Sequence, residues 1–398
     1  MRTLCHRSLP TFLSLFLSTS IVVSAPWPLG TLTTNSQTDP SCPSGFNCHG
    51  FAVSCPGVSN SIQGFWAIAP HQGTARGFVL FFTGGDGIGW WSTQVPELNG
   101  MVDELRSLGF TVAQARWVSS WLESSPGDAA GQAHLACRPA TLIKYLHDAY
   151  YLPMGITNLL PGMAGFCISG NSGGSSQVGY ALSHYGLDDI LDVVVPSGGP
   201  PHSALAKSCM TNAGQECYWF DLGTLEFIDR GFGFFNNNGP AVRHDASFVP
   251  RWLEESVSTG GNDYYHPATR VNFNIGENDP AMQCISSDYY NRLRTNGSPL
   301  LAYQIAPGTP HPVYSTDIGR AMIKAAILGL TLTSPVYTNH QFQFYVNGVT
   351  NTNISYIVQA SSNLTGWVPI RTNPGSFKFT DTNAGKYSAR FYRATSVP

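Results

Sequence analysis

The sequence predicts an α/β protein with a mostly parallel central sheet and a small antiparallel β module at its C-terminal end. From Phe51 to about Leu330, short apolar runs alternate with stretches in which apolar residues recur every three or four positions. Unbroken apolar runs are typical of strands buried on both faces, and helices between them favour parallel pairing. Beyond Thr331, short alternating segments are separated by Asn, Gly, Pro and Asp and have no helical period. We therefore expect one domain over residues 26–332 and a β-sandwich-like module over 337–398, with "TLTSPVYTNH" as a linker.

The first 25 residues have the features of a signal peptide. Arg2 and Arg7 precede the apolar run "TFLSLFLSTSIVV", and the small residues "VSA" follow it. The run is short for a membrane span, so we expect export and no span in the mature chain; an uncleaved anchor is the alternative. Residues 26 to about 47 are rich in Pro, Ser, Thr and Asn and are expected to be irregular.

The composition also favours a secreted protein, either periplasmic or extracellular. Charged residues make up 11% of the chain, against about 25% in an average protein. The net charge of −3 gives no reason to expect nucleic acid or an anionic membrane as a partner.

The cysteines indicate disulfide bonds. Nine are present, and eight remain once Cys5 leaves with the signal peptide; an even number in an exported chain favours pairing. Cys209 and Cys217 flank a short loop-like segment and form the most plausible pair. No pair of C-x-x-C motifs and no H-E-x-x-H motif occurs, so we expect no metal.

The elements of the larger domain can be placed in order. Strands are expected over residues 77–82, 110–118, 165–169, 191–199, 270–279 and 300–308. Helices are expected over residues 96–110, 131–151, 175–186, 284–295 and 317–330. Functional sites in such sheets collect at the carboxyl ends of the strands.

Ser172 lies at one of these strand ends, inside "GNSGG". An apolar strand precedes it and a helix follows, which is the setting of a nucleophile elbow. A flexible glycine-serine loop is the alternative interpretation. A nucleophilic serine needs a base, and the base needs an orienting acid.

Candidates for both partners follow later strands. Glu277 and Asp279 come directly after one strand, and His311 comes after the next, before the last long helix. Asp279, followed by Pro280, would also suit a helix cap. His202 is the main rival for the base, and two further histidines, His244 and His266, could line a pocket.

An oxyanion site needs backbone N–H donors. We expect one from Gly173 and the other from the loop "TGGDGIGWW", where Gly85 is the first choice and Asp86 the second. A plain glycine-rich turn is the alternative; a phosphate loop is not, because the Lys-Ser/Thr of that motif is missing.

Four segments together resemble an α/β-hydrolase of the secreted esterase and lipase type. They are strand–"TGGDG", strand–"GNSGG"–helix, strand–"GEND" and strand–"GTPH"–helix. The resemblance covers Phe51 to Leu330 and implies the order Ser172, Asp279, His311, with Asp279 preferred to Glu277. It departs from the family where Thr83 stands in place of the usual His before the oxyanion loop.

The terminal module has its own resemblance. Its segment "YIVQASSNLTGWVPIRTN" is similar to a C-terminal β repeat of secreted proteins from Verrucomicrobia-like bacteria. A bacterial origin implies unmodified sequons at Asn353 and Asn363.

The hydrolase resemblance also implies a cap over the acyl pocket, at about residues 200–265, where aromatic residues are frequent. Trp90 and Trp91 are candidates for substrate contact, although the aromatic residues of the cap could instead form its own core. We expect a serine esterase that needs no cofactor and acts on a small-molecule or polymer-borne ester. The alternatives are a peptidase of the same fold, or a non-catalytic surface or glycan-binding protein whose C-terminal module mediates attachment.

Overall fold

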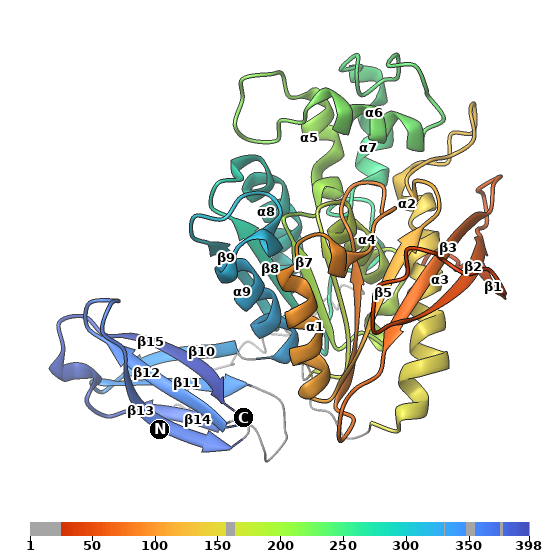
Figure 1. Cartoon of the computed structure of the whole chain (residues 1–398). Coiled ribbons are helices and arrows are strands. Elements are labelled where there is room, and N and C mark those ends of the chain that lie inside the picture. Colours follow the sequence, from red (N-terminus) through yellow and green to blue (C-terminus); the bar gives the residue numbers. More distant parts are fainter. Residues whose placement is uncertain (1–24, 157–163, 330, 348–354, 375–376, 398) are drawn as a thin grey trace, which may run out of the picture.

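The computed structural model describes residues 25–156, 164–329, 331–347, 355–374 and 377–397 (Figure 1). Apart from Ala25, the predicted signal peptide lies outside the described residues, as does the Asn353 sequon. None of the helices described is long and apolar enough to cross a membrane.

Within the described residues, nine strands form one sheet in the order β1-β2-β3-β5-β4-β6-β7-β8-β9. Strands β4 to β9 pair in parallel, while β1, β2 and β3 form an antiparallel extension that joins the sheet through β5. The strands are β1 Thr31–Asn35, β2 Asn47–Ser54, β3 Ile62–Ala69, β4 Gly77–Phe82, β5 Phe110–Trp117, β6 Phe166–Asn171, β7 Val193–Ser197, β8 Arg270–Gly276 and β9 Leu301–Ala306. The predicted mostly parallel α/β class is confirmed.

Helices cover both faces of this sheet (Figure 1). They are α1 Glu97–Ser107, α2 Gln132–Leu135, α3 Cys137–Leu146, α4 Gly173–Ser183, α5 Leu205–Met210, α6 Leu222–Gly231, α7 Val249–Glu255, α8 Pro280–Thr295 and α9 Asp317–Leu328. The central strand β4 shows why an unbroken apolar run was needed. Its residues Phe78, Leu80 and Phe82 pack in the cluster with α3, α4 and α8, while Val79 and Phe81 pack in the cluster with α1 and α9. Successive side chains point to opposite faces, so both faces of the strand are buried.

The N-terminal lead-in is more regular than expected, because β1 and the start of β2 lie within it. The sequence of β1, "TLTTN", is polar, and most of its side chains are exposed at the edge of the sheet. Such an edge strand is held by its backbone pairing with β2 and carries little apolar pattern.

The described residues contain the disulfides Cys42–Cys48, Cys55–Cys137 and Cys217–Cys284. The predicted Cys209–Cys217 pair is wrong, since Cys209 is a free, buried thiol on α5 and Cys217 is bonded to Cys284 of α8. Cys167 on β6 is also free and buried. Burial raises the pKa of both free thiols, which keeps them protonated and unreactive.

The C-terminal module consists of two three-stranded antiparallel sheets, β10-β11-β14 and β13-β12-β15. Its strands are β10 Thr331–Thr338, β11 Gln341–Asn347, β12 Ser355–Ser361, β13 Val368–Pro374, β14 Phe377–Asp381 and β15 Phe391–Val397. The sheets share a core that includes Phe344 and Val346 from one sheet and Tyr356 and Val358 from the other. The expected linker therefore forms β10 instead.

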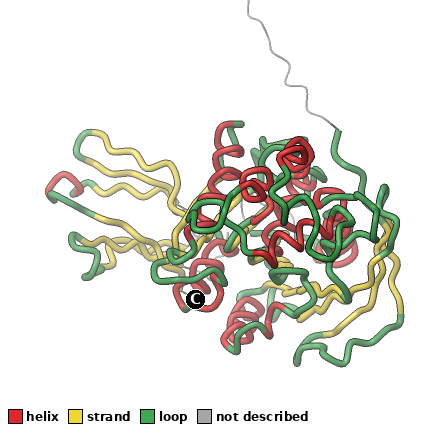
Figure 2. Tube along the Cα trace, turned by 90° about the horizontal axis from the view of Figure 1, so that it is seen from above, coloured by secondary structure: helices red, strands yellow, loops and turns green. Residues whose placement is uncertain are grey.

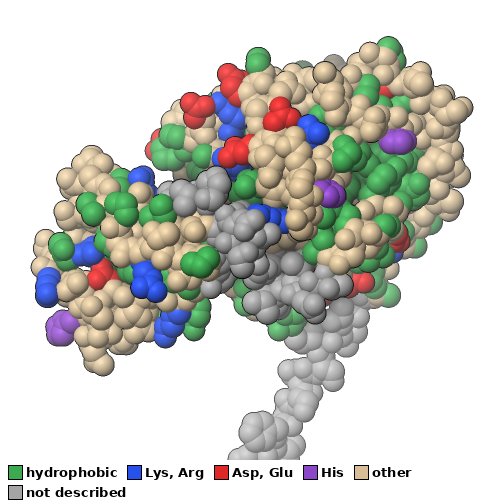
Figure 3. All heavy atoms as spheres, turned by 60° about the horizontal axis from the view of Figure 1, so that its bottom comes forward, with side chains coloured by type: hydrophobic (Ala, Val, Ile, Leu, Met, Phe, Trp, Pro, Cys, Tyr) green, Lys and Arg blue, Asp and Glu red, His purple; other side chains and the backbone are tan. Residues whose placement is uncertain are grey.

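The module lies to one side of the larger domain (Figures 1 and 2), and Leu108, just after α1, packs against its core. On the face drawn in Figure 3, its Lys and Arg side chains are spread out rather than gathered in one patch.

Candidate functional site

Ser172 occupies a sharp turn between β6 and α4. Its backbone has φ 54° and ψ −121°, a combination that a side chain other than that of glycine adopts only under strain. The half-buried serine lies at the carboxyl end of β6. This geometry is that of a nucleophile elbow.

The glycines around Ser172 are required by close backbone contacts. A Cβ atom at Gly170 would lie 2.2 Å from the backbone of Gly174, and one at Gly174 would lie 2.5 Å from the carbonyl oxygen of Phe82. Both distances are far below van der Waals contact, so "GNSGG" is a tightly packed turn rather than a flexible loop.

The loop after β4 lies against this turn. A Cβ at Gly173 would come within 2.3 Å of the Gly85 carbonyl oxygen and 2.9 Å of the Gly85 nitrogen, so the two expected oxyanion donors belong to touching backbone segments. Gly85 has φ 57°, and its carbonyl accepts a hydrogen bond from Trp121 Nε1 at 3.2 Å. Trp121, which the sequence did not single out, therefore fixes the peptide at Gly85.

Asp279 and His311 are in direct contact. Nδ1 of His311 lies 2.7 Å from Oδ2 of Asp279, and the His311 side chain is 40% exposed while that of Asp279 is 11% exposed. The other carboxylate oxygen, Oδ1, accepts the backbone N–H of Met282 at 3.5 Å and caps α8. The two interpretations of Asp279, orienting acid and helix cap, are therefore compatible, one on each oxygen.

Glu277, the alternative acid, has a different partner. Its carboxylate accepts the backbone N–H of Gly308 at 2.8 Å. It links the loop after β8 to the loop after β9, and a second bond between these loops runs from the N–H of Asn278 to the Thr309 carbonyl at 3.0 Å. Glu277 thus belongs to the support of the His311 loop.

Asn171 joins the serine strand to the histidine loop, and sequence reasoning missed it. Its side-chain oxygen accepts the backbone N–H of Val313 at 3.0 Å. A Cβ at Gly198, just after β7, would lie 2.4 Å from the His311 carbonyl oxygen. The ends of β6, β7, β8 and β9 therefore gather Ser172, His311 and Asp279 at one edge of the sheet. The only signal for Asn171 was its place directly before Ser172.

The other candidate histidines lie in different surroundings. His202 is buried between the rings of Trp121 and Tyr180, each 6.0 Å away, and burial lowers its pKa to about 3. His244 contacts the Cys209 carbonyl oxygen through Nδ1 at 2.6 Å. His266 is buried before β8, at the opposite end of that strand from Asp279.

Trp90 and Trp91 are packed into the protein, contrary to the expectation that they face a substrate. Trp90 is 3% exposed and donates from Nε1 to Ser41 Oγ at 3.2 Å; Trp91 is 1% exposed and stacks on Phe81 at 3.8 Å. They follow the oxyanion loop in the chain, but their rings fill the domain core.

The segment expected as a cap, about residues 200–265, contains α5, α6 and α7. Part of its aromatic content forms its own core, as Phe232, Phe248 and Trp252 meet edge to face. Other rings are solvent-facing, since Trp219 and Phe234 are each 39% exposed. The core interpretation therefore applies to part of the aromatic run, and substrate contact stays a prediction for the solvent-facing rings.

No protein-family model matches this chain, and no curated protein matches it. Among solved structures, it is similar to a bacterial heroin esterase, with 19% identity and a TM-score of 0.47 over 71% of this chain and 84% of that one. It is also similar to Est1E from Butyrivibrio proteoclasticus, with 14% identity and a TM-score of 0.41 over 71% and 96%. A third is the Pyrococcus horikoshii acylaminoacyl peptidase, with 12% identity and a TM-score of 0.42 over 71% and 40%. All three TM-scores are below 0.5 and all three identities are below 20%, so function has to come from the geometry of the site.

Proposed function

We propose that this protein is a serine hydrolase that cleaves carboxylic esters, with Ser172 as nucleophile, His311 as base and Asp279 as orienting acid. One observation carries the proposal: a serine at φ 54° lies at a strand end beside the His311 loop, and His311 is hydrogen-bonded to Asp279 of the neighbouring loop. A strained backbone at Ser172 costs free energy, and presentation of a nucleophile at the strand end explains why it is kept.

The contacts suggest how each group acts. Hydrogen bonding of His311 Nδ1–H to Asp279 leaves Nε2 as the proton acceptor. His311 takes the proton of Ser172 as its Oγ attacks the ester carbonyl carbon, and the oxyanion accepts hydrogen bonds from the N–H groups of Gly173 and Gly85. The intermediate collapses when protonated His311 gives the proton to the departing alcohol, leaving an acyl-enzyme.

Water completes the cycle. His311 deprotonates a water molecule, which attacks the acyl carbonyl, and the acid leaves as Ser172 regains its proton. None of these steps requires a cofactor. A peptidase uses the same groups on an amide, so substrate choice rests on the cap and not on the triad.

Ester hydrolysis by the purified chain tests this proposal. The wild type should hydrolyse p-nitrophenyl esters, whereas Ser172→Ala should lose about 10⁴-fold or more in kcat/KM. Ser107→Ala, at the exposed last residue of α1, is the matched control and should keep full activity. Running acyl chains of two to twelve carbons beside peptide p-nitroanilides separates esterase from peptidase. Full activity in Ser172→Ala, or none in the wild type towards either class, would refute the proposal.

We also propose export, with residues 1–25 removed. Disulfides form and persist in oxidising compartments, and the described residues contain three of them. N-terminal sequencing of the protein secreted by an expression host tests this, since retention of residues 1–25 would contradict it.

Attachment to a cell surface or glycan is the role we propose for the C-terminal module. It lies away from the carboxyl ends of β6 to β9 (Figure 1), so an attached partner leaves the site accessible. The partner class is tested by pull-down of the full chain with insoluble polysaccharides, against a chain that ends at Leu330.

A further inference from the structure

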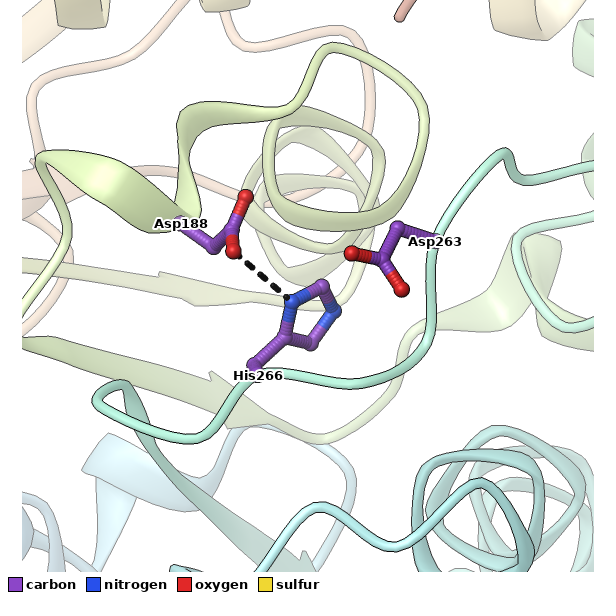
Figure 4. Close-up of side chains that lie close together, drawn as sticks. All are labelled: Asp188, Asp263 and His266. Carbon is purple, nitrogen blue, oxygen red and sulfur yellow. Dashed lines mark ion pairs between the residues drawn. The ribbon is translucent and has the colours of Figure 1, made fainter. Parts of the chain in front are cut away.

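Three potential metal ligands meet at the end of the sheet opposite to Ser172. Asp188 lies in the short 3-10 turn Leu187–Asp189 before β7, and Asp263 and His266 lie in the segment between α7 and β8. One ligand atom from each of the three lies within 4.8 Å of the other two. Figure 4 shows both carboxylates pointing toward the His266 ring.

The environment of His266 indicates a missing partner. The residue is fully buried, and its Nδ1 atom has no hydrogen-bond partner among the described residues. Oδ2 of Asp188 lies 3.6 Å from Nδ1, which is too long for a hydrogen bond. Asp188 is an ion-pair partner of Nδ1 only when His266 is protonated, and a buried neutral nitrogen without a hydrogen bond is unfavourable.

The spacing of Asp188 and His266 suits an ion between them. Zinc binds imidazole nitrogen and carboxylate oxygen at about 2.0–2.2 Å in tetrahedral geometry, which puts neighbouring ligand atoms roughly 3.3–3.6 Å apart. The observed separation of 3.6 Å between Nδ1 and Oδ2 matches that of two ligands on one ion.

Hydrogen bonds on the far side of the ring orient it for this role. Nε2 of His266 lies 3.4 Å from Oγ of Ser183, and that hydroxyl lies 2.7 Å from Oη of Tyr289. Tyr289 in turn donates to the Gly179 carbonyl at 3.4 Å. When Nε2–H donates to Ser183, the lone pair of Nδ1 points at the carboxylates, and metal-binding histidines typically have such a donor contact on their other nitrogen.

The ligand-bearing segment is also fixed by its backbone. The N–H of His266 donates to Ser298 Oγ at 3.0 Å, and Ser298 donates to the Tyr264 carbonyl at 2.8 Å. Oδ1 of Asp263 accepts the N–H of Tyr265 at 2.8 Å. The carboxylates are half-buried while the imidazole is buried, so an ion can enter from the solvent side.

We propose that Asp188, Asp263 and His266 bind one zinc ion, with water as the fourth ligand. The imidazole and the small number of carboxylates favour zinc over calcium, which takes six to eight oxygen ligands. The ion ties the turn before β7 to the segment that enters β8. It lies at the strand ends opposite to Ser172, so its role is structural and independent of the proposed hydrolysis.

Zinc binding by the full, tag-free chain tests this site. After treatment with EDTA and its removal, equilibrium dialysis should give one zinc per chain. Asp263→Asn keeps the oxygen that accepts the N–H of Tyr265 and should weaken zinc binding at least about tenfold. Loss of a residue that only hydrogen-bonds to a metal ligand already lowers metal affinity by about that factor. Asp189→Asn, at the exposed neighbouring acid, is the matched control and should bind zinc as the wild type does.

A stability measurement separates loss of the site from loss of the fold. Zinc should raise Tm by a few degrees in the wild type and Asp189→Asn but not in Asp263→Asn, while the three proteins should share one Tm in EDTA. Asp188→Asn is a second variant with the same expected outcome. Zinc binding at wild-type affinity in both Asp263→Asn and Asp188→Asn would overturn the proposal, as would binding of calcium in place of zinc, or no zinc binding at all.

Discussion

Strand β8 has a histidine–carboxylate pair beyond each of its ends, and the two pairs differ in every respect that matters for chemistry. Past the carboxyl end, His311 is 40% exposed and 2.7 Å from Asp279. Before the other end, His266 is fully buried and 3.6 Å from Asp188. The first pair is hydrogen-bonded and its histidine is accessible, as a catalytic base held by an orienting acid must be. In the second pair, the histidine is buried and its Nδ1 atom is too far from the Asp188 carboxylate for a hydrogen bond. This arrangement suits two side chains that bind one ion.

We expect the largest effect from a substitution that breaks the accessible pair, His311 and Asp279. His311→Ala removes the proposed base and should lower kcat/KM for p-nitrophenyl esters by about 10⁴-fold or more. Asp263→Asn changes the proposed zinc site, to which the buried pair belongs. It should leave kcat/KM within about twofold of the wild-type value, because that site lies at the other end of the strands. An active His311→Ala protein would move the base to another residue, with His202 the first to examine.

A slightly smaller effect should follow from changing the acid alone. Asp279→Asn keeps the shape of the side chain and its cap on α8 but lets the imidazole adopt the wrong tautomer, so kcat should fall by about 10³–10⁴-fold. Glu277→Gln, two residues away, should retain activity within a few-fold. Steady-state kinetics of the two variants measure the contrast, and the reverse ranking would make Glu277 the acid.

A third environment predicts an acid-dependent loss of stability. His184 and His202 are buried without a charged partner, and burial lowers the pKa of each to about 3. The unfolded chain binds these protons below pH 6.5, whereas the native protein does not until about pH 3. The free energy of unfolding should therefore fall as the pH drops from 6.5 towards 3, by about 1 kcal/mol per pH unit for each histidine.

Urea unfolding at pH 7 and pH 5.5 measures this loss, and His202→Gln should lose about 1 kcal/mol less than the wild type between these pH values. Comparing each protein with itself cancels any fixed packing defect of the glutamine. An identical pH dependence in both proteins would show that His202 titrates in the native state.

The smallest expected effect concerns strain at the serine. Ser172→Gly removes the side chain that makes φ 54° unfavourable and should raise the free energy of unfolding by about 1 kcal/mol, with activity abolished. Denaturant unfolding of this variant beside Ser172→Ala, which keeps the strain, measures the difference. Equal stability of the two variants would mean that the turn stores no strain.

The parts predicted from sequence were those encoded locally. The buried strand β6, the glycine turn and helix α4 follow one another within eighteen residues, so pattern and turn chemistry were enough to place Ser172. The positions of Asp279 and His311 after strands were predicted the same way, and their contact follows from parallel strands ending at one edge.

The parts that were missed depend on side-chain direction and long-range contact. Trp90 and Trp91 follow the oxyanion loop in the chain, yet the fold turns both rings inward. Cys217 pairs with a cysteine of α8, 67 positions away, where sequence proximity suggested Cys209. Asp188 and His266 match no metal motif because the sheet, rather than local spacing, brings them together.

The most direct test of the central claim is covalent labelling of the nucleophile. The full chain is treated with a fluorophosphonate, digested and analysed by mass spectrometry, with His311→Ala treated in parallel. We expect a single phosphonyl adduct on Ser172 in the wild type and greatly slowed labelling in His311→Ala. An adduct on a different serine, or an unlabelled Ser172 in the wild type, would contradict the account.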